Sequence, residues 1–448
     1  MHELFNVSGI LNLYLIIETN HIISRKLIIE IDFMNRNFSF ITSFIAAFFC
    51  YTCVSAQIDS VKSTPLDSGK TVAVKTDTLK NYPTYKIGIF APLYLDSVFT
   101  DNVFRYRQGI PRFILPALDF IQGAQVALDS MPTEKENIEA GFYDSKAYIQ
   151  NIPWLIENKK LDSLNFIIGN VKDVEYRQLA DFALQKKIPF ISATFPNDGG
   201  ITANPYLLIV NSTLRSHCEA MYSYILQNHG TDRIFLCRKK GTQEDLVAAF
   251  FKQLNNPDDK PLLDIQTLNF DSDPTPEYIK TKLDSTRKTV IIGGSLDESF
   301  ASKMALSCST LNSTYPITLI GMPTWDGFVS LHKKSGLENF PVYFTTTYCN
   351  SKSDDFSKIL MNAYSKKYKG KPSDMAFKGF ELTRLFTTAL TMYPKDFMNH
   401  INDTVFRVFN EYHFKPVLVK KENKSTDYIE NKHLYFMKIL NGVATRAW

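Results

Sequence analysis

Short, almost continuously apolar segments alternate with amphipathic segments over most of the chain, and this alternation restricts the possible folds more than any other feature. Segments of this kind are typical of buried strands. Strands that are apolar on both faces belong to parallel sheets covered by helices on both sides. The alternation therefore predicts a doubly wound α/β protein. The predicted strands are Tyr85–Phe90, Phe166–Gly169, Pro189–Ser192, Tyr206–Val210, Arg233–Cys237, Asp264–Phe270, Thr289–Gly293, Ile317–Gly321 and Val342–Thr346.

The segments between these strands carry apolar residues at helical spacing. Ile121, Ala124, Leu128 and Met131 are spaced to lie on one helix face. Thr242 is the predicted N-cap of a later helix. The other predicted helix faces run along Tyr176–Leu184, Leu214–Ile225, Val247–Leu254, Phe300–Leu311 and Phe356–Tyr364.

The number of strand–helix units predicts more than one sheet. A chain of 448 residues is long enough for two or three domains or one large two-lobed unit. In open α/β sheets, ligands bind outside the carboxyl ends of the strands. Two similar lobes would place these loops around a shared crevice, where ligands usually bind.

Residues 1–56 predict an upstream segment and a secretory signal. Arg36 is followed by the apolar run Phe40–Phe49, and Val54-Ser55-Ala56 forms a cleavage site before Gln57. The run is shorter than the roughly 20 residues of a membrane span. Cys50 and Cys53 lack the small residues that precede a lipidated cysteine, so lipoprotein anchoring is the less favoured reading. We expect a periplasmic protein that begins with a flexible leader at residues 57–83.

Charge and cysteine content limit the possible partners. The chain has 50 Lys and Arg against 46 Asp and Glu, a formal net charge of +4, and this even balance argues against nucleic acid. Cys218, Cys237, Cys308 and Cys349 follow the signal. Free buried thiols are the favoured interpretation, and a single disulfide of undetermined pairing is the alternative.

The sequence lacks the common motifs of catalysis and cofactor binding. Gly69-Lys70-Thr71 ends like a P-loop, but Thr64 occupies the position of its first glycine. Gly293–Asp297 lacks the closing glycine of a nucleophile elbow. The histidines that follow the signal form no i, i+4 pair that could start a metal site. We predict that the protein is not an enzyme and needs no metal ion or cofactor.

Several segments occur in the order found in one family of receptors. They are Asp119–Leu128, Ile167–Gly169, Ile188–Ser192, Thr289–Gly294, Lys371–Glu381 and Tyr428–Phe436. From Tyr85 to its end the chain resembles the type I periplasmic binding proteins, and the spacing from Gly169 to Ser192 is similar to that in branched-chain amino-acid-binding members. Residues Tyr428–Phe436 resemble the terminal strand pair of that family.

The resemblance implies two Rossmann-like lobes joined by a three-strand hinge. It places residues 84–208 and 340–412 in the first lobe and residues 209–339 and 413–448 in the second. It implies capture of a small polar solute between the lobes and delivery to an ABC-type importer. We expect a monomer.

The strand assignment and the resemblance together give the candidate ligand-binding residues. Glu298 fits the acidic position that holds an ammonium group in amino-acid-binding relatives, although a helix N-terminal role remains open. Lys172–Glu175 stand where those relatives carry small hydroxyl residues. The candidates are Tyr94, Tyr143, Ser192, Thr194 and Asn197 in the first lobe and Arg238, Glu298 and Trp325 in the second.

A second function remains open at this stage. A cell-envelope regulatory or scaffold protein of the same fold would bind a protein partner instead of a solute. The loss of hydroxyl residues at Lys172–Glu175 favours that alternative.

Overall fold

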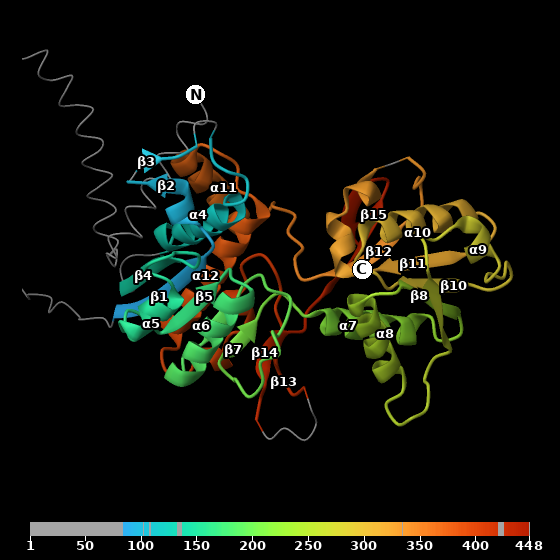
Figure 1. Cartoon of the computed structure of the whole chain (residues 1–448), viewed down its shortest axis with the longest axis horizontal. Helices are drawn as coiled ribbons and strands as arrows, with labels where there is room; N and C mark the ends of the chain where they lie inside the picture. The colour runs from blue at the N-terminus through green and yellow to red at the C-terminus, as the bar shows by residue number, and fades with distance from the viewer. Residues whose placement is uncertain are drawn as a thin grey trace, which may run out of the picture.

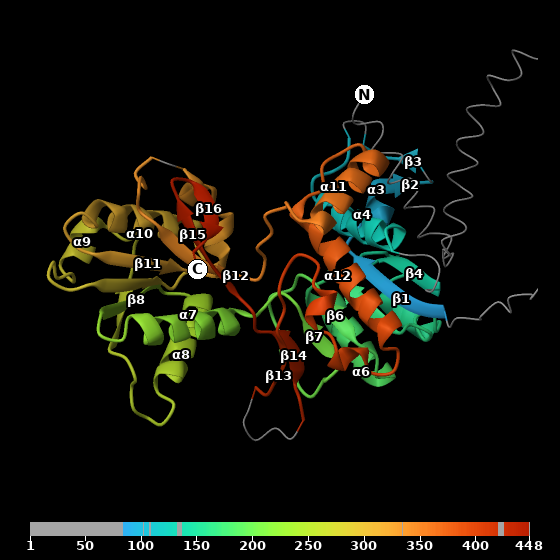
Figure 2. The same ribbon diagram turned by 180° about the vertical axis from the view of Figure 1, so that it is seen from behind.

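The computed structural model describes residues 84–447 except 102, 107–108, 132–136, 334 and 420–424. The predicted signal and leader lie outside the described residues. Two seven-stranded sheets form two lobes that lie side by side (Figure 1). Figure 2 shows from behind that extended segments join the lobes near the middle of the molecule.

The first lobe is built on a largely parallel sheet with the strand order β13-β14-β7-β6-β5-β1-β4. The alternation of buried side chains explains why the strands read as continuously apolar. Ile89, Ile168 and Ile191 belong to the core on one face, whereas Phe90 and Phe190 belong to the core on the other face. The strands are β1 (Thr84–Ala91), β4 (Asn137–Asp144), β5 (Phe166–Gly169), β6 (Phe190–Ser192), β7 (Leu207–Ile209), β13 (Phe414–Val417) and β14 (Tyr428–Asn431).

Helices cover both faces of this sheet. One face carries α4, α11 and α12, and the other carries α5 and α6. A short helix and a two-stranded hairpin lie between β1 and α4. The elements are α3 (Leu95–Val98), β2 (Phe99–Thr100), β3 (Val103–Phe104), α4 (Leu115–Asp129), α5 (Ile152–Glu157), α6 (Asp173–Lys186), α11 (Asp355–Tyr368), α12 (Asp374–Met392), η3 (Phe397–Asn399) and η4 (Thr404–Phe406).

The second lobe repeats the design with the strand order β16-β15-β12-β11-β10-β8-β9. Helices α7 and α8 lie on one side of this sheet, and α9 and α10 lie on the other (Figure 1). The elements are α7 (Leu214–Asn228), β8 (Arg233–Lys239), α8 (Thr242–Asn255), β9 (Ile265–Phe270), α9 (Pro276–Lys280), β10 (Thr289–Gly293), α10 (Glu298–Leu311), β11 (Ile317–Gly321), η1 (Pro323–Gly327), η2 (Val329–His332), β12 (Val342–Thr346), β15 (Tyr435–Leu440) and β16 (Val443–Arg446).

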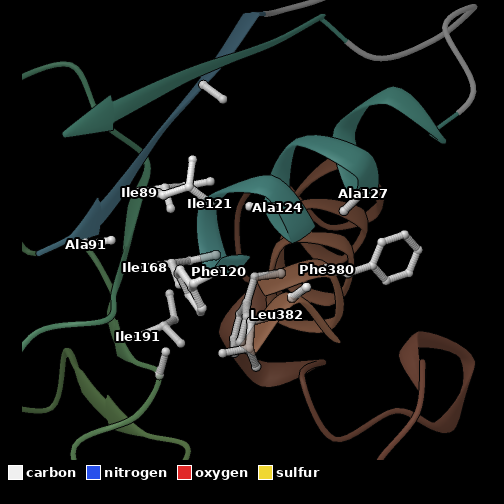
Figure 3. Packing of buried hydrophobic residues seen from close by; sticks show 14 of the residues in the cluster. Ile89, Ala91, Phe120, Ile121, Ala124, Ala127, Ile168, Ile191, Phe380 and Leu382 are labelled. Carbon is white, nitrogen blue, oxygen red and sulfur yellow. The ribbon is translucent and has the colours of Figure 1, made fainter. Parts of the chain in front are cut away.

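The core of the first lobe depends on a close approach between α4 and α12. A Cβ atom added at Gly123 would lie 1.9 Å from the carbonyl oxygen of Ala376, so the two backbones nearly touch. In Figure 3, Phe120, Ile121 and Ala124 of α4 lie between the strand side chains and α12. Only a glycine permits this helix–helix distance.

The chain crosses between the lobes three times, and two crossings differ from the predicted boundaries. β12 pairs with β11 and β15 of the second lobe, so residues 342–346 do not belong to the first lobe. β13 and β14 join the sheet of the first lobe. The prediction was wrong here because an apolar strand can join either sheet, and only its pairing decides. Residues 210–213, 347–354 and 432–434 make the crossings.

Other sequence-based expectations are largely met. The nine predicted strands are present, with ends that shift by at most two residues, and the doubly wound α/β fold class is confirmed. The predicted terminal pair is divided, because β14 and β15 lie in different sheets. Thr242 is the first residue of α8, and Gly241 is the N-cap.

Two further observations concern the cysteines and the membrane. All four described cysteines are free; Cys218, Cys237 and Cys308 are buried and Cys349 is half-buried. Within residues 84–447, apart from the gaps given above, no helix combines the length and apolar character required to cross a bilayer.

Candidate functional site

The carboxyl ends of the parallel strands in both lobes point toward the opposite lobe. β7 leads directly into the first crossing and β12 leads into the second. β1, β5 and β6 run in the same direction as β7, and β8, β10 and β11 run in the same direction as β12. The loops after all of these strands therefore face the region between the lobes, which is where α/β proteins bind ligands.

A chain of hydrogen bonds joins two of these loops to two crossings, and we call it the hinge chain. The Thr194 hydroxyl donates to Asn170 Oδ1 over 2.8 Å. The Asn211 amide donates to the Thr194 carbonyl oxygen over 2.9 Å, and the Thr347 hydroxyl donates to Asn211 Oδ1 over 2.8 Å. Asn170 and Thr194 follow β5 and β6, whereas Asn211 and Thr347 lie in the first and second crossings. The loops at the candidate site are thus coupled to the hinge.

A buried carboxylate ties the third crossing to the second lobe. Glu430 at the end of β14 accepts hydrogen bonds from the Thr213 N–H over 2.7 Å and the Ser216 hydroxyl over 2.8 Å. Its second oxygen lies 2.8 Å from Lys432 Nζ. Thr213 is the N-cap of α7. This contact restrains the first turn of the second lobe against the last strand of the first lobe.

One of the predicted aromatic residues, Trp325, belongs to a core, and another, the half-buried Tyr143, packs against one. Tyr143 stacks on Phe90 with ring centroids 4.6 Å apart, and its ring folds back over Gly141. Trp325 is fully buried, and its indole N–H donates to the Ser295 carbonyl oxygen over 2.9 Å. Its ring covers the paired glycines Gly293 and Gly321, where a Cβ atom would come within 2.3 and 2.1 Å of it. The expectation that Trp325 lines a cleft is therefore wrong, whereas the half-buried Tyr143 stays a prediction.

The other predicted residues of the first lobe are placed around the loops as follows. Tyr94 is half-buried and makes an edge contact with Phe113. Ser192 is fully buried at the end of β6, and no described residue forms a hydrogen bond with its hydroxyl. Thr194 is part of the hinge chain. Asn197 is exposed and accepts a hydrogen bond from the Gly199 N–H.

The predicted charged residues of the second lobe are engaged within that lobe. Arg238 forms an ion pair with Asp245 at the start of α8. Glu298, the first residue of α10, accepts hydrogen bonds from the Ser330 N–H over 3.2 Å and from the Ser330 hydroxyl over 3.0 Å. Both side chains lie at the carboxyl edge of the sheet, but neither is brought into contact with the first lobe.

The loops of the first lobe also contain charged groups that are already paired. Lys146 Nζ lies 2.6 Å from Glu175 Oε1 in the first turn of α6. The pKa of Lys146 is raised mainly by this hydrogen bond. Asp144 is buried and accepts from the backbone N–H groups of Leu93 and Leu95 over 2.9 and 2.8 Å. Glu175 at the start of α6 is therefore already paired with Lys146 of the neighbouring loop.

One buried acid that the sequence analysis did not single out lies on α12. Glu381 is fully buried and accepts from the N–H groups of Phe409 and Asn410, the Asn410 amide and the Tyr412 hydroxyl over 2.6–3.0 Å. Burial raises the pKa of Glu381, and these donors oppose the increase. An acid at a buried position of an amphipathic helix is the sequence signal that could have revealed it.

No group of three or more His, Cys, Asp or Glu side chains that could hold a metal ion occurs in the described part of the chain. The candidate site therefore consists of hydroxyl, amide and charged side chains at the facing carboxyl edges. Such an arrangement can bind a solute through hydrogen bonds and ion pairs.

These features define a two-lobed α/β receptor fold, and comparisons with known proteins agree. A family model described as periplasmic binding protein matches residues 155–396. The chain belongs to the periplasmic binding proteins and has the type I fold. No curated protein sequence matches it significantly.

Solved structures with the same fold cover most of this chain. A Rhodospirillum rubrum protein assigned to branched-chain amino acid ABC transport has a TM-score of 0.59 at 12% identity, over 81% of this chain and all of its own. An ABC transporter substrate-binding protein from Desulfitobacterium hafniense has a TM-score of 0.50 at 11% identity, over 81% of this chain and 100% of its own. A branched-chain amino acid ABC transporter periplasmic ligand-binding protein from Burkholderia xenovorans has a TM-score of 0.50 at 12% identity, over 80% of this chain and 90% of its own.

Proposed function

We propose that the protein is an exported receptor that binds a small polar solute between its lobes and delivers it to an ABC-type importer. Membership of the periplasmic binding proteins supports the receptor role. The names of the similar structures, which refer to ABC transport, support the importer as partner. The observation that carries the proposal is the hinge chain from Asn170 and Thr194 to two crossings, because it links the loops at the site to the joint between the lobes.

In this proposal, the first lobe supplies the initial contacts with the solute. Asn170 and Thr194 are half-buried polar residues at the carboxyl ends of adjacent strands. Asn170 Oδ1 accepts the hydrogen bond from Thr194. The side-chain NH2 group of Asn170 is therefore the donor for a solute. Tyr94, Ser192 and Asn197 remain candidates at the edge of the same loops.

The second lobe completes the site when the hinge closes. Arg238 and Glu298 are held by partners of their own lobe, so closure would exchange these contacts for contacts with the solute. A solute that binds the closed arrangement better than the open one shifts the population toward closure. Recognition of this kind needs neither a nucleophile nor a cofactor.

The proposal is tested by thermal unfolding of the mature chain with a panel of polar metabolites. A solute at 100 times its Kd stabilises the folded protein by about 2.7 kcal/mol. Asn170→Ala should weaken binding of that solute by roughly fivefold, since one hydrogen bond contributes about 1 kcal/mol. Thr310→Ala, at an exposed position of α10, is the matched control and should respond like the parent protein.

If no solute raises the melting temperature and an envelope protein co-purifies with the chain, the receptor proposal is wrong. A protein-binding scaffold would then be the better interpretation.

A further inference from the structure

The first turns of α12 place three charged residues on one face of the helix. Asp374, Lys378 and Glu381 are four and three residues apart, which brings their side chains to the same side. This face lies against the second crossing, residues 347–354. Lys352 Nζ lies 2.9 Å from Asp374 Oδ1, and the Cys349 N–H donates to Asn410, which itself binds Glu381. Lys378 therefore lies beside the hinge, between two anchored acids.

Neither acid requires Lys378 as its partner. Glu381 already receives four hydrogen bonds from the segment 409–412. Asp374 is paired with Lys352, whose ammonium also lies 5.1 Å from the ring centre of Phe377. The side chain of Lys378 is half-buried and takes part in no hydrogen bond or ion pair with any described residue. Burial lowers the pKa of Lys378, whereas Glu381 and Asp374 act in the opposite direction.

Two buried hydroxyl groups, one in the second crossing and one at the N-cap of α12, have no hydrogen-bond partner among the described residues. The hydroxyls of Tyr348 and Ser373 are buried, and no hydrogen bond of ordinary geometry reaches them from the described residues. Ser373 is the N-cap of α12, but its side chain does not cap the helix. Tyr348 lies in the second crossing, next to Cys349, whose N–H binds Asn410. The pKa of Tyr348 is raised by burial and by Asp374 and Glu381, whereas the Asn350 side chain lowers it. Buried polar groups without partners are uncommon and call for an explanation.

The second lobe carries an exposed acid, Asp326, in the loop that follows β11. Asp326 lies in η1, at the carboxyl end of β11. Its pKa is raised by burial and also by the charge of Asp374, whereas His332 lowers it. Asp374 is paired with Lys352 of the second crossing, so the start of α12 lies where the chain passes from one lobe to the other. Lys378, Tyr348 and Ser373 therefore lie near the region between the lobes.

We propose that Lys378, Tyr348 and Ser373 form a binding subsite for the anionic group of the solute, a carboxylate or a phosphate. One ammonium and two hydroxyl donors suit such a group. Asp326 then faces a hydrogen-bond donor of the same solute from the second lobe. This inference rests on the proposed function. It places the anion-binding groups at the start of α12 and not at residues 172–175, where Glu175 is already paired with Lys146.

A structural role for Lys378 makes the opposite prediction for stability. A lysine that serves as counter-ion to Glu381 stabilises the unliganded protein, and Lys378→Met would then lower the melting temperature. A lysine reserved for a ligand is an unpaired and partly desolvated charge. Its replacement by Met should raise the melting temperature of the unliganded protein.

The test compares the parent protein with Lys378→Met, Lys378→Arg and the control Lys366→Met, which changes an exposed lysine of α11. Thermal unfolding is followed with inorganic phosphate, with a panel of carboxylates and phosphate esters, and with sodium chloride at equal ionic strength. The chloride series and Lys366→Met correct for general salt effects on stability. We expect at least one anion to stabilise the parent protein and Lys366→Met, with about 10- to 100-fold weaker binding to Lys378→Met.

The outcomes separate this inference from the proposed function. If a neutral solute stabilises the parent protein and Lys378→Met equally and no anion acts, the receptor stands and the anion subsite is refuted. The subsite is also refuted if Lys378→Met lowers the melting temperature of the unliganded protein, or if Lys378→Met responds to the anion as strongly as the parent. If no solute of any charge binds, both proposals fail. Partial binding by Lys378→Arg would support a requirement for positive charge.

Discussion

Replacement of Glu430 by Gln should destabilise the protein through the hinge. Glu430 is 1% exposed, and its carboxylate accepts from Thr213, Ser216 and Lys432. The amide of Gln keeps an oxygen for Thr213 and Ser216, but it presents an N–H group to the ammonium of Lys432. The variant therefore loses one ion pair and the charge on two further hydrogen bonds.

The size of the effect can be worked out from these contacts. A hydrogen bond to a charged group contributes about 1.5–3 kcal/mol, and a neutral one contributes about 0.5–1.5 kcal/mol. Two bonds weakened by about 1–1.5 kcal/mol each and one lost pair of about 1.5–3 kcal/mol sum to roughly 3.5–6 kcal/mol, which overlaps the range of about 3–5 kcal/mol for a broken buried ion pair. Lys432 retains Ser216 at 2.5 Å and Glu219 at 3.2 Å, and its side chain is 21% exposed. We therefore expect a loss of about 2–4 kcal/mol.

Thermal unfolding and urea unfolding of both proteins measure this change. The control is Glu411→Gln, which removes the charge of an acid that lies 3.5 Å from Arg407 with both side chains about half exposed. A surface pair of this kind contributes less than about 1 kcal/mol. If Glu430→Gln and Glu411→Gln differ from the parent protein by the same small amount, the account of the hinge is incorrect.

Two further predictions concern a buried histidine and a helix contact. His217 shares a hydrogen bond with Thr345, and burial lowers its pKa from the usual 6.5 to about 4. The unfolded chain therefore binds this proton more readily than the folded protein. The free energy of unfolding should fall as the pH drops from about 6.5 to 4. His217→Gln should flatten the melting temperature over that pH range, and an unchanged slope would contradict the assignment. Gly123→Ala should lower the free energy of unfolding in urea by more than about 2 kcal/mol, because the added methyl group meets the backbone of Ala376. The control Gly327→Ala places no atom within 4 Å of the added group and should change it by less than about 0.5 kcal/mol. Equal effects of the two substitutions would refute the close helix contact.

Strands and fold class could be predicted because strands that are buried on both faces have almost continuously apolar sequences. Phe166–Gly169, Thr289–Gly293 and Ile317–Gly321 are strands with the predicted bounds. β4 was not predicted, because it is an edge strand that pairs with β1 alone and contains polar residues such as Glu139. An edge strand does not need a continuous apolar sequence.

The candidate site was harder to predict because it depends on pairing between distant strands. Trp325 follows a strand and was expected to line the cleft. Its ring instead covers glycines that only the sheet register brings together, Gly293 beside Gly321. Lys378 was within a recognised motif, but the absence of a partner for its ammonium becomes apparent only when Glu381 and the segment 409–412 are placed.

The central claim is that a solute binds between the two lobes and draws them together. Small-angle X-ray scattering of the mature chain, with and without the solute that raises its melting temperature, tests this claim most directly. The account predicts a smaller radius of gyration when the solute is present, and no such change for Asn170→Ala at the same solute concentration. An unchanged radius of gyration for the parent protein saturated with the solute would contradict binding between the lobes.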